Sequence, residues 1–264
     1  MSLLRDIQTR IIRRQYDKSV RALETSAPED LTARGEGRLL QAFQRAAEQV
    51  SAYRELLQRE EIDPAQITSA EEFTGAIPVL DKHMVFADNA LRDLCVGGTL
   101  DGIGAFYSSS GHSGVFSFGV ETWEELGKAA LSLEFILDTM FSVFKRKTLL
   151  INCLPMGVKV PTRTIPVADT SVRPDVIFAL LDKLESDFEQ FIVVGESPFL
   201  KKLLEEGAEA GVPWHDLLVH VITGGEFIAE NMRSYFGHLL GLDFDDASRG
   251  LMLVNMGLSE LGLS

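Results

Sequence analysis

A run of hydroxyl-bearing residues and glycines is the first segment of this 264-residue chain that could do chemistry. Residues 108–114 read Ser-Ser-Ser-Gly-His-Ser-Gly. Glycines let the backbone turn tightly with its N–H groups pointing inward, and hydroxyls can donate beside them to phosphate oxygens. Because the segment stands between an expected strand and an expected helix, we interpret it as an anion-binding loop. The alternative is an ordinary flexible surface loop.

This loop differs from two common nucleotide-binding motifs, and it carries a histidine. It is not a Gly-x-Gly-x-x-Gly turn, and Val115 follows Gly114 where a Gly-Lys-Ser/Thr loop would have lysine. His112 could donate to a phosphate, act as a general base or face solvent. A serine triad is not indicated, because no Gly-x-Ser-x-Gly elbow occurs. The remaining histidines and the two cysteines lack metal-ligand spacing, so no zinc site is predicted.

Two more candidate loops follow apolar runs near the end of the chain. Thr223-Gly224-Gly225-Glu226 comes after the run 217–222. Its glycines would let a flat or bulky group approach the backbone, and Glu226 could accept hydrogen bonds or cap the next helix. The alternative is a plain strand-to-helix turn.

The other loop, Met256-Gly257-Leu258-Ser259-Glu260, follows the run 251–255. A hydroxyl beside a carboxylate at the end of a strand can bind a phosphate oxygen and its Mg²⁺ together. A fourth segment, Gly195 to Pro198, is most simply a helix cap with proline in the first turn.

Apolar runs that alternate with helical patterns predict the elements that position these loops. Buried strands are expected at 103–108, 148–154, 191–194, 217–222 and 251–255, and helices near 121–144, 174–188, 198–207 and 229–240. Such alternation is typical of an α/β fold, in which helices cover both faces of a parallel-rich sheet. Ligands of these sheets bind beyond the carboxyl ends of the strands, where the candidate loops lie.

The first hundred residues read differently. Three- and four-residue spacing of apolar side chains predicts helices over 3–23 and 38–59, joined by a polar connection over 26–37. Short elements and turns are expected over 62–102, with a helix capped by Asp81. We therefore expect an N-terminal helical layer over residues 1–60 and an α/β nucleotide-binding core over residues 61–264. The arginines of the first helix are interpreted as a solvated face rather than a patch for an acidic partner.

Composition excludes several classes of protein. Lys and Arg number 25 against 39 Asp and Glu, a net charge of −14, which disfavours nucleic acid as a partner because phosphate binding needs a basic face. No apolar stretch is long enough to span a membrane, so no membrane association is expected. Cys95 and Cys153 are too few for a disulfide framework, and we expect a cytoplasmic protein.

The three loops, in this order, resemble the adenylate-forming superfamily of acyl-CoA synthetases, and within it the phenylacetate–CoA ligase-like branch. Ser108–Gly114 resembles the phosphate loop, Thr223–Glu226 the Gly-Gly-Glu segment, and Met256–Glu260 the Tyr-Gly-Leu/Met-Ser/Thr-Glu motif. Residues 52–56 and 77–82 are similar to two further stretches of that branch.

The resemblance implies an enzyme that joins a carboxylic acid to ATP and passes the acyl group to a thiol. Its cofactors would be ATP, Mg²⁺ and CoA, and its partners a nucleotide and a carboxylic acid. Ser108, Ser109, Ser110, Gly111, His112, Ser113 and Gly114 would hold phosphates, and Gly224, Gly225, Glu226, Met256 and Gly257 would flank the nucleotide. Ser259 would meet the α-phosphate, Glu260 would coordinate Mg²⁺, and His112 would complete the catalytic set. The acyl pocket would be lined by segments such as 152–164.

Departures from the family pattern leave two interpretations open. Val115 replaces a lysine, Met256 an aromatic residue, and the chain ends four residues after Glu260, before the family's C-terminal domain. The chain is then either the N-terminal, adenylation-type portion of a ligase, not competent for turnover alone, or a non-catalytic binding or assembly protein that keeps the fold. Because the docking face of a second domain would be exposed, we also expect self-association as a homo-oligomer.

Overall fold

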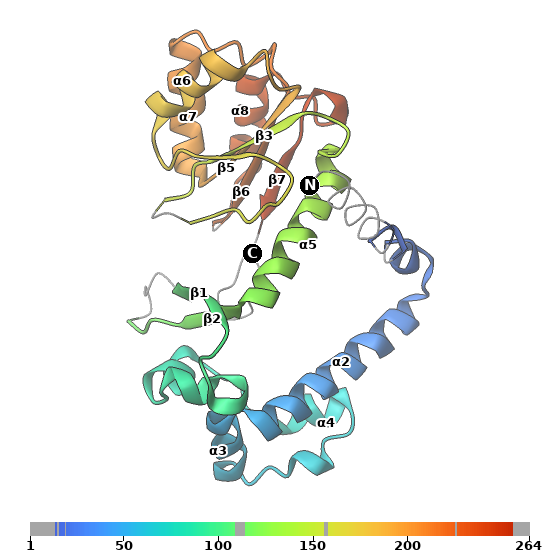
Figure 1. Ribbon diagram of the computed structural model, residues 1–264. Coiled ribbons are helices and arrows are strands. Elements are labelled where there is room, and N and C mark those ends of the chain that lie inside the picture. Colours follow the sequence, from blue (N-terminus) through green and yellow to red (C-terminus); the bar gives the residue numbers. More distant parts are fainter. Residues whose placement is uncertain are drawn as a thin grey trace. The chain divides into compact units, whose positions relative to one another are not determined.

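The computed structural model describes residues 14, 16–18, 20–108, 114–155, 158–224 and 226–255. The chain divides into two compact units, Met1–Trp123 and Glu124–Ser264, and each is described by itself (Figure 1). The helical layer that the sequence predicts over residues 1–60 falls within the first unit.

The helices of the first unit begin earlier than the sequence pattern predicts. α2 spans Pro28–Gln49 and α3 spans Ser51–Arg59, so the expected connection over 26–37 is wrong. Proline suits the first helical turn because its φ is already fixed and its missing N–H would have no intrahelical acceptor, and two acidic residues follow it at the positive end of the helix. The expected helix 38–59 is interrupted at Val50, whose backbone is extended.

Short elements follow, as the turn residues predict. They are a 3-10 turn at Pro64–Gln66, α4 at Ala70–Ala76, a π-helical turn at His83–Ala87, and 3-10 turns at Leu91–Leu94 and Val96–Gly98. Asp81 accepts a hydrogen bond from the N–H of Met84 at 2.8 Å, which confirms its capping role. The apolar core of this unit gathers Phe43, Ala47, Leu57 and Ile67.

A β-hairpin closes the first unit. β1 (Ile103–Ser108) pairs antiparallel with β2 (Phe118–Thr122), which the sequence analysis did not anticipate. Residues 108–114 therefore follow one strand and precede its antiparallel partner, and the prediction that they join a strand to a helix is wrong. The missed signal was period-two alternation in the segment that becomes β2, which was too short to compete with the long helical pattern behind it. That helix, α5, spans Trp123–Phe141.

A parallel five-stranded sheet is the centre of the second unit (Figure 1). Its strands are β3 (Thr148–Asn152), β4 (Val167–Asp169), β5 (Gln190–Gly195), β6 (Val219–Gly224) and β7 (Met252–Asn255), in the spatial order β4-β3-β5-β6-β7. Every neighbouring pair is parallel, so the predicted α/β fold is confirmed. Only β4 was not expected, because it has three residues and lies at the edge of the sheet.

Helices cover both faces of this sheet (Figure 1). α6 (Pro174–Leu184), α7 (Ser197–Glu209) and α8 (Glu230–Leu240) pack on one face, and α5 packs on the other. Alternate residues of the strands serve the two cores: Ile151, Val193 and Val221 face α6 to α8, whereas Leu150 and Ile192 face α5. In the described part of the chain, no helix combines the length and apolar character needed to cross a membrane.

The connections that leave β3 and β5 diverge. These strands are neighbours, with Asn152 opposite Val194. After β3 the chain turns towards the α5 face, where Val160 and Ile165 join the apolar core, whereas after β5 it enters α7 on the opposite face. In open α/β sheets, the carboxyl ends of two strands whose connections part in this way are where ligands bind.

A closed polar network lies inside the sheet near the starts of its strands. His220 is 1% exposed; its Nδ1 accepts from the N–H of Leu251 at 3.1 Å, so its Nε2 carries the proton and donates to Gln190 Oε1 at 3.2 Å. Gln190 in turn donates to the Phe141 carbonyl and to Thr148 Oγ1. Burial, and next the charge of a nearby arginine, lower the pKa of His220 from 6.5 to about 4.

The stability of the folded chain should therefore decline as the pH is lowered from 6.5 to 4. As the pH falls through that range, His220 becomes protonated in the unfolded chain but stays neutral in the folded chain. The free energy of unfolding therefore decreases by up to about 3 kcal/mol. Urea denaturation across this range should show a shallower decline for His220→Gln than for the unsubstituted chain. His238→Gln, which changes an exposed histidine of the same unit, is the control. Parallel pH profiles for the unsubstituted chain and His220→Gln would contradict this account.

Candidate functional site

The hydroxyl-rich loop is described only at its two ends. Ser108 is the exposed last residue of β1, and Gly114 has a positive φ of 81° with no atom within 4 Å of the position a Cβ would take. This conformation favours glycine, which agrees with a tight turn at the end of the loop. Ser109, Ser110, Gly111, His112 and Ser113 lie outside the described residues.

Gly224 has a reason to be glycine that does not involve a ligand. It is the last residue of β6 and pairs with Asn255 of β7. A Cβ on Gly224 would lie 2.5 Å from the carbonyl oxygen of Asn255, which is backbone. The preceding residue, Thr223, is buried and shares a 3.1 Å hydrogen bond with Ser197 at the start of α7. The glycine and the hydroxyl pair thus fix where β6 ends.

The rest of the second and third predicted loops is placed only in part. Glu226 is exposed and does not cap α8, because that helix begins at Glu230 after Ala229. Gly225 lies outside the described residues, as do Met256, Gly257, Ser259 and Glu260. Since β6 and β7 are adjacent, the two segments start side by side at the carboxyl edge of the sheet.

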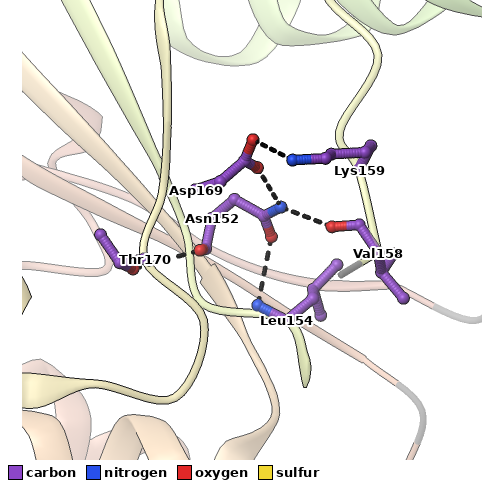
Figure 2. Close-up of polar contacts among 6 residues, drawn as sticks. All are labelled: Asn152, Leu154, Val158, Lys159, Asp169 and Thr170. Carbon is purple, nitrogen blue, oxygen red and sulfur yellow. Dashed lines mark hydrogen bonds and ion pairs between the residues drawn. The ribbon is translucent and has the colours of Figure 1, made fainter. Parts of the chain in front are cut away.

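The side-chain amide of Asn152, whose N–H groups and oxygen are all hydrogen-bonded, lies at the carboxyl end of β3 (Figure 2). Asn152 is 2% exposed, and its Nδ2 donates to the Val158 carbonyl at 2.7 Å and to Asp169 Oδ1 at 2.8 Å. Its Oδ1 accepts from the N–H of Leu154 at 3.1 Å. The reversed amide would place oxygen against two acceptors and N–H against a donor, so these contacts allow one orientation.

An ion pair between Lys159 and Asp169 connects this amide to the exposed surface (Figure 2). Lys159 Nζ lies 2.6 Å from Asp169 Oδ2, and its side chain is 70% exposed. The hydrogen bonds from Lys159 and then from Asn152 lower the pKa of Asp169, so its carboxylate stays charged. Lys159 therefore exposes its ammonium group to solvent while it pairs with the carboxylate of Asp169, which also accepts a hydrogen bond from Asn152.

The segment between these strands is a long irregular loop with defined anchors. We call residues 153–166 the β3–β4 loop; Met156 and Gly157 within it lie outside the described residues. Glu134 of α5 is 2% exposed and accepts from the backbone N–H groups of Arg163 and Thr164. Long irregular loops in compact domains are usually either functional or disordered, and this one is anchored near both ends. A side-chain amide of the sheet holds its start, and a carboxylate of α5 holds its end.

Nothing at this edge provides a thiol nucleophile. Cys153 follows Asn152, but it is fully buried, and burial raises the pKa of its thiol to about 12. Thr170 completes the packing by donating to the main-chain carbonyl of Asn152 at 3.1 Å (Figure 2). The polar groups described here therefore offer hydrogen bonds and an exposed, carboxylate-paired ammonium group, but no reactive thiol.

Sequence reasoning placed the acyl pocket in residues 152–164 but did not single out Asn152, Lys159, Asp169 or Glu134. A signal existed for Asn152, because it is a polar residue within the predicted apolar run 148–154, on the side of the strand that Leu150 shares. The partners could not be inferred, since β4 was not anticipated. Among the residues that the structure describes, no three His, Cys, Asp or Glu side chains come together as metal ligands.

Removing the carboxylate of Glu134 should destabilise the chain. Glu134→Leu leaves two backbone N–H groups without an acceptor, and we expect a loss of about 2–4 kcal/mol in the free energy of unfolding. Glu134→Gln keeps an oxygen that can accept both bonds and should cost less. Urea denaturation measures both variants, and faster amide exchange at Arg163 and Thr164 in the leucine variant would locate the effect. Equal stability of the two variants would show that the carboxylate does not hold the loop.

Gly224→Ala should also destabilise the chain, with no nucleotide present. The added Cβ meets backbone of β7, so one strand must shift, at a cost of roughly 1–3 kcal/mol. Gly37→Ala is the matched control: it lies in α2 with open space around it and should be neutral or slightly stabilising. A normal melting temperature for Gly224→Ala would show that the pairing of β6 with β7 does not require glycine at this position.

Comparisons with known proteins show the fold. The chain matches no protein-family model and no curated protein. Among solved structures it resembles an open conformation of 2-hydroxyisobutyryl-CoA ligase, a structure in complex with 2-HIB-AMP and CoA, with a TM-score of 0.63 and 17% sequence identity. The match covers 86% of this chain and 53% of the ligase chain, so this chain spans about half of the ligase's length. The α/β fold is therefore shared with the matched part of that ligase, in agreement with the fold that the sequence predicted.

Proposed function

We propose that this chain is the nucleotide- and acid-binding portion of an AMP-forming carboxylate–CoA ligase of the adenylate-forming superfamily, in its phenylacetate–CoA ligase-like branch. The observation that carries the proposal is the fold likeness to a CoA ligase over 86% of the chain, together with three loops whose residues match the superfamily's motifs. That ligase was solved with an AMP derivative and CoA, which supports ATP and CoA as the substrates of this chain.

The sheet supports this assignment at the nucleotide end. Gly224 and Asn255 are paired, so the segments that contain Glu226 and Glu260 leave the sheet from neighbouring strands. We assign adenine to Gly224 through Glu226, the α-phosphate to Ser259 and Mg²⁺ to Glu260. The loop from Ser108 to Gly114, including His112, would hold the outer phosphates. Met256 would provide an apolar contact to the nucleotide, with Gly257 beside it.

The acyl group would bind at the ends of β3 and β5, where the connections diverge. The substrate's carboxylate oxygen would attack the α-phosphorus of ATP, the bond to the bridging oxygen would break, and pyrophosphate would leave. The CoA thiolate would then attack the acyl carbon and release AMP. Both steps require positioning and neutralisation of charge more than covalent help from the protein, which fits an edge of hydrogen-bonded polar groups without a reactive thiol.

The cheapest test is binding of ATP·Mg²⁺ by thermal shift. At 100 times its dissociation constant a ligand stabilises a protein by about 2.7 kcal/mol, so millimolar ATP·Mg²⁺ should raise the melting temperature. Glu260→Gln should remove the dependence on Mg²⁺, whereas Glu209→Gln, an exposed carboxylate of α7, should not. Pyrophosphate exchange with a panel of carboxylic acids then measures adenylation.

Two outcomes would redirect the proposal. If ATP·Mg²⁺ causes no thermal shift, the chain is better explained as a non-catalytic protein that retained the fold. If ATP binds but no acid supports exchange, this chain binds nucleotide without adenylating on its own. Sedimentation at high concentration tests the expected self-association, and a monomer would contradict it.

A further inference from the structure

We infer that Asn152 is a positioning residue for the acyl group, because its side-chain amide sets the path of the β3–β4 loop where that loop leaves the sheet. The inference rests on the proposed function, which places the acyl group at this edge. It deepens that function by naming the side chain that gives the acyl pocket its shape.

The first argument is the distribution of the amide's hydrogen bonds. Two of its three partners are backbone atoms of the β3–β4 loop, the N–H of Leu154 and the carbonyl of Val158. One side chain thus contacts the loop at two described points, Leu154 and Val158. The third partner, Asp169, ties the same amide to β4 and, through Lys159, to the loop again.

The second argument is position. Asn152 lies opposite Val194, on the two strands whose outgoing connections part to opposite faces of the sheet. That is the point at which open α/β sheets bind ligands. The N–H of Cys153 still bonds to the Val194 carbonyl at 2.8 Å, so pairing with β5 extends one residue past Asn152. Beyond this point the sheet no longer determines the path of the chain, and the amide does.

The third argument is the free-energy cost of burying a side-chain amide at residue 152. The same face of β3 carries Leu150, and an apolar side chain at residue 152 would continue that core without burying polar atoms. A buried amide is tolerated only when its hydrogen bonds are complete, and here all of them serve the edge rather than the core. Strand pairing alone does not require these contacts, since β3 and β4 are already joined along their backbones.

Three variants separate positioning of the loop from simple support of the strands. Asn152→Asp keeps an oxygen for Leu154 but cannot donate to Val158 and repels Asp169. The double variant Asn152→Asp with Asp169→Asn restores a donor between β3 and β4, now from residue 169, yet still leaves the Val158 carbonyl without its donor. Asp169→Asn alone keeps the whole Asn152 amide network, and it is the matched control for the loss of the charge beside Lys159.

The affinity for the acid, compared with the affinity for ATP·Mg²⁺, is the readout. Calorimetric titration would use phenylacetate, hexanoate and 2-hydroxyisobutyrate, with the tightest binder to the unsubstituted chain carried into the variants. We expect Asn152→Asp and the double variant to weaken acid binding by about tenfold, the loss expected for one displaced hydrogen-bonded contact, with ATP·Mg²⁺ affinity changed less than about twofold. Asp169→Asn measures what losing the charge beside Lys159 does by itself, and the double variant should bind the acid about tenfold more weakly than Asp169→Asn does.

The outcomes distinguish the two levels of the proposal. If the unsubstituted chain binds no acid and supports no exchange, the proposed function fails and this inference fails with it. If the unsubstituted chain binds acid and the double variant binds it equally well, the function stands and the positioning role is wrong. Equal weakening of acid and nucleotide in the double variant would also overturn it, because that pattern indicates a general structural defect. The double variant keeps the test decisive if Asn152→Asp does not fold.

Discussion

The parallel pairing of β3 with β5 is the constraint on which the second unit depends. Both strands are buried on both faces, and apolar side chains from α5 and from α6 to α8 meet them from opposite sides. Because each face needs its own cover, the chain leaves β3 towards one face and β5 towards the other. The divergence that creates a ligand-binding edge is therefore a consequence of burying the sheet, and it does not require a ligand in order to form.

The polar groups of the sheet lie at its two ends and differ in how they are satisfied. Near the starts of the strands, His220, Gln190 and Thr148 bond to one another and to backbone, and all three are buried. At the carboxyl edge, the buried amide of Asn152 leads through Asp169 to an exposed ammonium group. The first network specifies the packing of a core, whereas the second connects the core to solvent.

The sequence predicted most of the second unit and less of the first. Long apolar runs such as the predicted run 148–154 identify strands buried on both faces, because few other elements have that pattern. β2 and β4 were missed, since a two-stranded hairpin and a three-residue edge strand give little periodic signal. The segment 26–37 was predicted as a connection because it is polar and contains Pro28, Gly35 and Gly37. Both glycines lie in the exposed first half of α2, where no atom lies within 4 Å of the position a Cβ would take.

Gly224 and Asn152 differ in how strongly each indicates a functional site. Paired glycines after β6 suggested a group approaching the backbone, but the carbonyl of Asn255 already fills the space beside Gly224, so the sheet explains that glycine without a nucleotide. Asn152 is the opposite case, because the sheet would accept an apolar side chain there, and the amide instead holds a loop that strand pairing does not guide. A buried polar residue that bonds mainly to a loop is thus the stronger indication of function. It was harder to recognise from sequence because its partners, Leu154, Val158 and Asp169, meet only in the folded chain.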